Sequence, residues 1–274
     1  MNNLLKEAGF HILKTNTLNI IVQNKWENSD LIKLMGMSPR ELLSQSNILT
    51  KKLPTVPSTT VIRVSFKNYR LYFKFFHISK FSYKIRDTIR HTKAEKALQG
   101  SLLIKKAGLR TPDVVAIAHR RGLKKTSHIL LITNEVEGIS LRLYSREYQI
   151  PRDKRIQIAY NLGKDIATMH KHLVSHGDLH PGNILLDKKK LNFFYLDTER
   201  VKKTHTKFNK YMLKDLSLLN HPNLGCFSKE DRLIFIRSYF NELKENIPFT
   251  LEEFIKQIHY LSNKRYIKND NDQK

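Results

Sequence analysis

The sequence contains a single cysteine, Cys226, so an intrachain disulfide and a cysteine-ligated zinc site are both excluded. We therefore expect the protein to work in a reducing compartment. The N-terminus lacks the basic segment and the continuous apolar stretch of a secretory signal. No apolar run approaches the roughly eighteen residues that a membrane span requires. These absences predict a cytoplasmic protein.

Acidic residues are scarce relative to basic ones. Lys and Arg total 49 against 25 Asp and Glu, a formal net charge of +24. Such a charge attracts nucleic acid, anionic lipid headgroups or a polyanionic substrate. An AT-rich genome that favours lysine codons would produce the same excess on a solvated surface. Charge alone does not choose between these explanations.

Strands are predicted before about residue 134. The runs that alternate or are rich in β-branched and aromatic residues are 59–66, 69–76, 113–118 and 128–133. Lys67 and Asn68 can turn the first pair into a hairpin, and a basic turn around Gly122 joins the second pair. A helix is predicted over residues 87–107, because Gly108 follows it as a C-cap.

Helices are predicted after about residue 152. Residues 153–173 repeat apolar positions at helical spacing, and residues 210–261 are mostly helical. Two short strands, 184–186 and 193–196, interrupt this half. We expect an α+β fold in one domain over residues 1–274, with a small β-rich lobe and a helical lobe. The expected boundaries are an extension at 1–44, a first lobe at about 45–134, a hinge at 133–138, a second lobe at 139–262 and a flexible tail at 263–274.

One loop carries candidate chemistry. The run HGDLHPGNILL, residues 176–186, holds Asp178 and Asn183 five residues apart between a helix and a short strand, and Asp197 ends the next strand. Phosphoryl transfer needs one carboxylate for the attacking hydroxyl, and an amide and a second carboxylate for magnesium. Alternatively, Asp178 and Asn183 merely cap turns.

The loop resembles that of the protein-kinase-like superfamily, H-x-D-x-x-x-x-N, over residues of about 58 to 240. The resemblance implies ATP as phosphoryl donor and Mg²⁺, for which Mn²⁺ could substitute. It implies that Asp178 is the catalytic carboxylate and that Asn183 and Asp197 hold the metal.

The same resemblance implies ATP-binding residues in the first lobe. Lys74, flanked by aromatic residues, matches the kinase strand lysine, although an edge-strand lysine in solvent has the same pattern. The glutamate that pairs with this lysine is assigned to Glu95, because no other acidic residue lies between Asp87 and Gly108. Gln99 could take its place, or Glu95 could be a solvated helix residue. No glycine-rich loop precedes the strand.

Two further positions are expected to face ATP. Ser58 and Thr59 lie where the phosphate loop is expected and could cradle phosphates. Glu135 and Val136 lie in the expected hinge, where backbone groups would meet the adenine.

Several departures separate the chain from ordinary protein kinases. Gly177 replaces the arginine that receives an activation-loop phosphate, His180 replaces a lysine, and Thr198-Glu199 follows Asp197 instead of Phe-Gly. Segments 107–112, 197–200, 214–220 and 228–240 resemble instead the lipopolysaccharide core kinases that phosphorylate heptose or Kdo.

This resemblance implies an acceptor sugar of the lipopolysaccharide core, or another anionic acceptor, and a peripheral position at an anionic inner-membrane surface. Alternatives are a protein kinase or an RNA-associated RIO-like kinase, which would bind nucleic acid with a steep salt dependence, and a pseudokinase acting as a binding module. Antibiotic phosphotransferases share the loop, but a basic chain suits their cationic drugs poorly. The sequence leaves the acceptor hydroxyl, the oligomeric state and the metal preference open.

Overall fold

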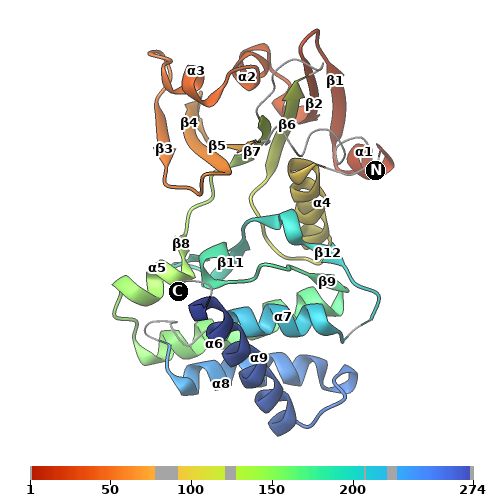
Figure 1. Ribbon diagram of the computed structural model, residues 1–274, viewed down its shortest axis with the longest axis vertical. Helices are drawn as coiled ribbons and strands as arrows, with labels where there is room; N and C mark the ends of the chain where they lie inside the picture. Colours follow the sequence, from red (N-terminus) through yellow and green to blue (C-terminus); the bar gives the residue numbers. More distant parts are fainter. Residues whose placement is uncertain (1, 78–91, 121–127, 207, 221–226, 272–274) are drawn as a thin grey trace. The chain divides into compact units, whose positions relative to one another are not determined.

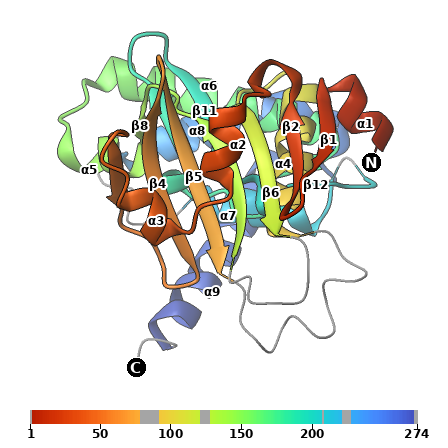
Figure 2. The ribbon, with the colours of Figure 1, turned by 90° about the horizontal axis from the view of Figure 1, so that it is seen from above.

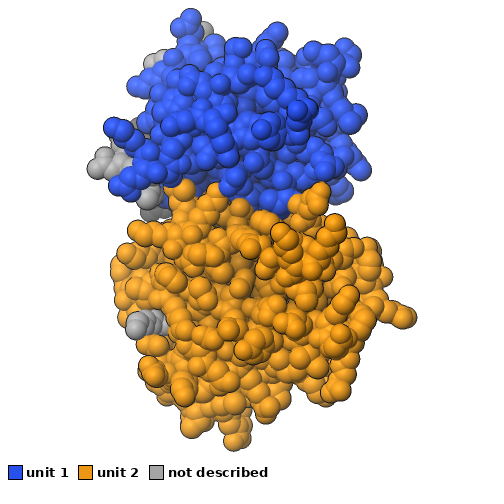
Figure 3. Space-filling view, turned by 180° about the vertical axis from the view of Figure 1, so that it is seen from behind, with its two compact units in different colours: residues 1–99, 112–136 blue, residues 100–111, 137–274 orange. Residues whose placement is uncertain are grey.

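A computed structural model of the chain describes residues 2–77, 92–120, 128–206, 208–220 and 227–271. The chain divides into two compact units, residues 1–99 with 112–136 and residues 100–111 with 137–274 (Figure 3). The predicted turn around Gly122, Cys226 and the first residues of the helix expected at 87–107 lie outside the described residues.

The first unit is built on a seven-stranded antiparallel sheet in the order β1-β2-β6-β7-β5-β4-β3 (Figures 1 and 2). Its strands are β1 (Phe10–Lys14), β2 (Leu18–Gln23), β3 (Thr50–Leu53), β4 (Thr59–Phe66), β5 (Tyr69–His77), β6 (Val114–Arg120) and β7 (His128–Asn134). The short helices are α1 (Asn2–Glu7), η1 (Asn24–Trp26), α2 (Ser29–Met35) and α3 (Pro39–Leu43). The four strands predicted before residue 134 are therefore present.

Alternation along β4 and β5 explains the sheet. Every second side chain points to one face of a strand, and Ile62, Val64, Phe73 and Phe75 are all fully buried on that basis. Helices α2 and α3 cover this face, since Leu31 and Leu42 join the same apolar cluster. Figure 2 shows both helices lying across the sheet.

Residues 1–44, expected as an extension before the first lobe, instead supply β1 and β2 to the sheet. Ile20 and Val22 of β2 are completely buried, and Ile21 pairs with Ile117 of β6. The short run 18–23 is nearly continuously apolar, a pattern that does not distinguish a buried strand from a helix. Its pairing with a strand about 100 residues later is decided by the tertiary structure.

The second unit is mainly helical, with two small sheets. Its helices are the C-terminal part of α4 (Lys93–Lys106), α5 (Leu141–Glu147), α6 (Arg152–Lys171), η2 (Pro181–Asn183), η3 (Thr198–Arg200), α7 (Lys210–Leu219), α8 (Lys229–Leu243), η4 (Lys244–Asn246) and α9 (Leu251–Asn271). The strands are β8 (Ile139–Ser140), β9 (Val174–Ser175), β10 (Ile184–Asp187), β11 (Asn192–Tyr195) and β12 (Lys202–Lys203). The sheets have the orders β11-β10-β8 and β12-β9.

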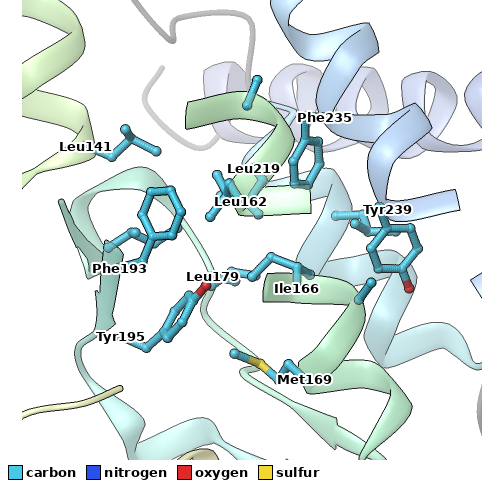
Figure 4. Packing of buried hydrophobic residues seen from close by; sticks show 14 of the residues in the cluster. Leu141, Leu162, Ile166, Met169, Leu179, Phe193, Tyr195, Leu219, Phe235 and Tyr239 are labelled. Atoms are coloured by element: carbon cyan, nitrogen blue, oxygen red, sulfur yellow. The ribbon is translucent and has the colours of Figure 1, made fainter. Parts of the chain in front are cut away.

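Helix α6 is the centre of this unit's core (Figure 4). Leu162, Ile166 and Met169 repeat at helical spacing and are buried. Gly163 allows α8 to approach closely, because a Cβ there would lie 2.6 Å from the carbonyl oxygen of Phe235. The helix ends at Lys171, two residues before the predicted end, because Leu173 adopts a left-handed φ of 58° and turns the chain into β9.

The end of the chain differs from the expected flexible tail at 263–274. Helix α9 continues as far as Asn271, so the boundary expected near residue 262 falls inside a helix. None of the helices within the described ranges is long and apolar enough to cross a bilayer.

Candidate active site

The loop 176–183 begins directly after β9 and is held from below by a buried carboxylate. Asp215 of α7 is fully buried and accepts hydrogen bonds from the backbone N–H groups of His176 (2.8 Å) and Gly177 (2.8 Å) and from the Ser175 hydroxyl (2.8 Å). His170 of α6 lies 3.4 Å away. These contacts join two helices to the start of the loop.

The charge on Asp215 suits this role. Burial by itself would raise the pKa of the carboxyl, but the contacts from His170, His176 and Ser175 together hold the pKa below its ordinary value. The carboxylate is therefore ionised at neutral pH. An ionised carboxylate accepts several N–H bonds at once, which a neutral side chain of this size does not.

His176 links the loop to the end of β11. Its Nε2 lies 2.9 Å from the carbonyl oxygen of Leu196, so Nε2 carries the proton and donates. Burial lowers the pKa of His176, although Asp215, Asp178 and Asp197 act in the opposite direction. Among the residues that the structure describes, its buried Nδ1 has no hydrogen-bond partner. The neutral ring therefore connects the loop that begins at His176 to the residue that follows β11.

The three residues predicted for chemistry in the second unit come together here. The Asn183 side-chain amide donates to the carbonyl oxygen of Asp178 (2.9 Å), and the backbone N–H of Leu196 donates to the carbonyl oxygen of Asn183 (2.8 Å). Asp197 follows Leu196 directly. Both Asp178 and Asp197 lie close enough to His180 to act on its pKa. Asp178, Asn183 and Asp197 are therefore close together in the structure, as the sequence predicted.

The turn at Asp197 is unusual for a residue with a side chain. Asp197 adopts a left-handed conformation with φ of 53° and precedes η3. Thr198 is buried, and Gly100 of α4 lies against its carbonyl group, where a Cβ would collide. Backbone in this region costs about 1 kcal/mol or more for an L-residue. Packing against α4 holds the strained turn.

Asp178 is the accessible carboxylate of the loop. Its side chain is one-third exposed, and its Oδ1 lies 3.8 Å from Nη1 of Arg200. Gly177 precedes it with φ of 79°, and a Cβ on Gly177 would lie 2.6 Å from the carbonyl oxygen of Arg200. Lys214 also donates to the Gly177 carbonyl oxygen (2.6 Å). The loop presents Asp178 while its backbone is fixed on both sides.

The donor set fits a magnesium ion. Because the Asn183 amide nitrogen is engaged with the loop, its oxygen Oδ1 is the atom that would face a metal. Asn183 and Asp197 would supply hard oxygen ligands, with phosphate oxygens and water completing the shell. The described residues contain no cluster of three or more His, Cys, Asp or Glu side chains suited to a metal.

The predicted lysine and glutamate belong to the first unit. Lys74 lies in β5, paired with Val61 and Leu131, and its Nζ lies 5.1 Å from the ring centroid of Phe76. Lys74 is thus in a central strand, which excludes the edge-strand alternative.

Glu95 has a local contact at the start of α4. It exchanges hydrogen bonds with Thr92, whose N–H donates to Oε2 (2.8 Å) and whose hydroxyl accepts from the Glu95 N–H (3.2 Å). Its pairing with Lys74 stays a prediction.

The other predicted ATP contacts also lie in the first unit. Ser58 and Thr59 form the turn between β3 and β4, where the Thr59 N–H donates to Val56 and the Ser58 carbonyl accepts from His77. Thr59 is also the first residue of β4. A phosphate cradle at this turn stays a prediction.

The side chain of Glu135 is bound within its own unit. Its carboxylate contacts Arg70 (2.6 Å), Arg63 (3.6 Å) and the Tyr72 hydroxyl (2.8 Å), while Val136 is half-buried. The adenine contact of Glu135 and Val136 stays a prediction. The Glu135 N–H donates to the carbonyl oxygen of Arg70.

Sequence reasoning missed Asp215 and Arg142. Asp215 lies 38 residues from Gly177 in the chain. A contact over that separation has no short-range spacing from which it could be predicted. The guanidinium of Arg142 lies 3.4 Å from His180 Nδ1. The sequence pattern of α5 does not predict this contact. Segment 214–220 did contribute to the family resemblance, which was the one available signal for Asp215.

Known proteins resemble the chain in sequence profile and in fold. The sequence profile of the lipopolysaccharide kinase (Kdo/WaaP) family matches residues 55–239, more than half of the chain. No curated protein sequence matches. The structure of WaaP in complex with acyl carrier protein is similar over 89% of this chain and 97% of that chain, with a TM-score of 0.59 and 19% identity. The Mycobacterium tuberculosis PknI kinase domain matches 79% of this chain and 96% of that chain, with a TM-score of 0.43 and 12% identity. The WaaP similarity confirms the predicted α+β protein-kinase-like fold.

Proposed function

Because the chain belongs to the lipopolysaccharide kinase (Kdo/WaaP) family, we propose that it transfers a phosphoryl group from ATP to a heptose or Kdo hydroxyl of the lipopolysaccharide inner core. Membership makes the chain a kinase, a phosphotransferase of lipopolysaccharide biosynthesis, and ATP is the donor that the family implies. The acceptor sugar, the magnesium ion and the residue roles are the proposed part.

In this proposal Asp178 accepts or orients the proton of the attacking sugar hydroxyl. Its carboxylate is partly exposed on a loop whose backbone is fixed by Asp215. Such a group must be accessible to the acceptor and yet held in one position, since misplacement by about 1 Å costs about 100-fold in rate. Arg200, whose Nη1 lies 3.8 Å from Oδ1, keeps a cation beside the carboxylate.

Asn183 and Asp197 would hold the metal on the same loop. A bound Mg²⁺ supplies charge neutralisation for the ATP phosphates. The residues' own contribution is orientation: the Asn183 amide is turned by its bond to the Asp178 carbonyl, and the turn at Asp197 is held by η3. Lys74 is proposed to bind ATP phosphates from the first unit, with Glu95 as its partner, and Ser58, Thr59, Glu135 and Val136 as further ATP contacts.

One observation carries the proposal. The carbonyl oxygen of Asp178 and the side chain of Asn183 are hydrogen-bonded at 2.9 Å, and Asn183 is bonded in turn to the residue before Asp197. A pair of turn-capping residues, Asp178 and Asn183, would not need a second acidic residue, Asp197, at the same place. The arrangement supports phosphoryl transfer over a purely structural loop.

The test is transfer of labelled γ-phosphate from ATP to dephosphorylated lipopolysaccharide core, beside a generic protein and RNA. We expect the core to be labelled. An unlabelled core with labelled protein would favour the protein-kinase alternative, and RNA binding with a steep salt dependence would favour the RIO-like one. Core preparations that end in Kdo alone or extend to heptose separate the two acceptor sugars.

Two variants assign the residue roles. We expect Asp178→Ala to abolish turnover while ATP binding is largely retained, because Asp178 acts on the acceptor. We expect Asp197→Ala to weaken Mg·ATP binding. Normal turnover by Asp178→Ala would show that this carboxylate is not the catalytic group.

We further propose that the protein works on the cytoplasmic face of the inner membrane, bound to the anionic surface. The α5 patch, defined as Leu143, Arg146, Tyr148 and Lys188–Lys190, supports this. All its members are exposed, and Lys188 Nζ lies 4.8 Å from the Tyr148 ring centroid. Exposed apolar and aromatic side chains among cations are typical of surfaces that dock on anionic lipid.

An acyl carrier protein is a second candidate partner. WaaP, the structural neighbour, was solved in complex with acyl carrier protein. Copurification of this chain with the acyl carrier protein of the same cell tests the idea. Its absence from the purified active kinase would exclude a required complex.

A further inference from the structure

The guanidinium of Arg142 lies directly against the loop that carries Asp178. Its Nη2 is 3.4 Å from Nδ1 of His180, two residues after Asp178. The base of the side chain is fixed, because Leu141 is buried and the Ser140 hydroxyl caps α5 by accepting from the Leu143 N–H. The residue as a whole is exposed to solvent.

The partner of Arg142 is an uncharged nitrogen. The backbone N–H of Gly182 donates to the same Nδ1 at 3.1 Å, so this nitrogen carries no proton and the His180 ring is neutral. Arg142 has five N–H donors, and one nitrogen is used on the ring. Among the residues that the structure describes, no carboxylate forms an ion pair with Arg142.

The loop makes room for the guanidinium. A Cβ on Gly182 would lie 3.4 Å from Cζ of Arg142 and 3.0 Å from Cε1 of His180. A larger side chain at Gly182 would thus press on both groups. Close approach, rather than an unusual backbone conformation, explains the glycine here.

Arg142 lies against the same short loop that carries Asp178. The backbone N–H of His180 donates to the carbonyl oxygen of Asp178 (2.9 Å), so the ring that Arg142 contacts and Asp178 belong to one tight turn. An acceptor whose hydroxyl reaches Asp178 would therefore bring neighbouring substituents close to Arg142. A planar guanidinium binds a carboxylate or phosphate through two parallel hydrogen bonds.

We propose that Arg142 binds an oxyanion of the acceptor, a sugar carboxylate or a phosphate next to the hydroxyl that receives the phosphoryl group. The proposal rests on the proposed function of the loop and adds an acceptor requirement to it. Arg142 is then a specificity residue, since it distinguishes an anionic core sugar from a neutral one.

The kinetic test uses soluble core oligosaccharide, so that membrane binding plays no part. We expect Arg142→Ala to raise the KM for the oligosaccharide roughly 10- to 100-fold, with kcat and the KM for ATP nearly unchanged. Arg142→Lys should recover part of the loss, since lysine keeps the charge but not the planar fork. Arg237→Ala removes an exposed arginine of α8 and is the matched control.

Modified acceptors identify the oxyanion. One preparation has its carboxyl groups reduced and another has its phosphates removed. The wild-type protein should lose affinity for the preparation that lacks the recognised group, and Arg142→Ala should lose nothing further with it. A penalty with the carboxyl-reduced core indicates a sugar acid, and a penalty with the dephosphorylated core indicates a phosphate.

Two results would overturn the inference. If Arg142→Ala lowered kcat equally for every acceptor, the side chain would only hold the loop, and if it behaved like Arg237→Ala there would be no subsite. Binding of free Kdo and of a phosphorylated heptose, followed by ligand-observed NMR, decides the matter even if the wild type transfers phosphate to no core acceptor. If the wild type transfers no phosphate, loss of the bound-ligand signal in Arg142→Ala but not in Arg237→Ala would support the subsite, and only the proposed acceptor reaction would fail. Wild-type signals retained in Arg142→Ala would refute the oxyanion subsite.

Discussion

Asp215 makes several hydrogen bonds where most buried side chains make one or two. It accepts from Ser175, His176 and Gly177, each at 2.8 Å, without being part of the loop itself. Removing one partner of a buried charged network leaves unsatisfied donors, which costs about 3 kcal/mol. The side chain therefore couples the stability of the second unit to the position of Asp178.

We expect Asp215→Asn to lower the free energy of unfolding by about 3 kcal/mol and to reduce kcat strongly. Asparagine offers one acceptor oxygen and would turn an NH₂ group towards N–H donors. Urea unfolding and steady-state kinetics measure both effects. Asp187→Asn, at the end of β10, is the control and should change neither much, because its side-chain oxygen can still accept from the N–H groups of the following turn. A fully active and stable Asp215→Asn protein would contradict the anchoring role.

Asp165 of α6 has the opposite pKa shift. Burial raises the pKa of this carboxyl to about 6, although the Tyr195 hydroxyl at 3.3 Å and Arg110 act to lower it. Because the folded pKa exceeds the ordinary 3.8, Asp165 contributes stability below about pH 4 that is lost as the pH rises through about 6.

We expect Asp165→Asn to remove this pH dependence. At pH 7 the variant should be more stable than the wild type by up to about 3 kcal/mol, since asparagine never ionises and still accepts from Tyr195. Unfolding free energies measured from pH 4 to 8 make the comparison. An unchanged slope between pH 4 and 7 would mean that Asp165 is not the group responsible.

At the scale of elements, the site depends on loops that pack backbone to backbone. Gly177 and Gly108 share nearly the same left-handed φ, 79° and 78°. Only Gly177 is crowded, with the Arg200 carbonyl oxygen 2.6 Å from where a Cβ would lie, whereas nothing lies within 4 Å at Gly108. A side chain at Gly108 would therefore meet only the strain of a left-handed backbone, whereas a side chain at Gly177 would also clash with Arg200.

We expect Gly108→Ala to cost about 1 kcal/mol, the strain of a left-handed alanine, with activity retained. Gly177→Ala should cost more and should abolish activity, because the loop must move away from Arg200. Thermal unfolding and kinetics of both variants test this. Equal losses would show that the contact between the loop and η3 contributes nothing.

Some helices and strands were predicted well from their sequence pattern, and others were not. The hairpin of β4 and β5 was predicted nearly to the residue, since period-2 burial is a local signal. Strand β2 was missed although it forms a local hairpin with β1, because its short apolar run does not distinguish a buried strand from a helix. Helix α6 was predicted, but its end was set by the left-handed Leu173 rather than by a glycine.

At the scale of the whole molecule, the net charge of +24 is the dominant property. Basic residues near an anionic bilayer contribute on the order of 1 kcal/mol each. The α5 patch combines three consecutive lysines with Arg146 and the exposed side chains of Leu143 and Tyr148.

We expect cosedimentation with vesicles that contain phosphatidylglycerol, none with neutral vesicles, and release as the ionic strength rises. Lys188→Glu combined with Lys189→Glu should weaken vesicle binding about 10-fold or more. The charge-matched control is Lys51→Glu with Lys52→Glu in β3. Equal weakening by both pairs would mean that total charge, and not the α5 patch, drives binding.

The sequence by itself determined the types of most elements, the fold class and the family, because these depend on periodicity and on motifs within a few residues. It also placed Asp178 and Asn183 on one loop, since five residues of tight turn keep two side chains near each other. The tertiary structure alone decided which distant groups complete that loop: Asp215 beneath it and Arg142 beside it. Such contacts arise from packing between elements far apart in the chain, and no local pattern encodes them.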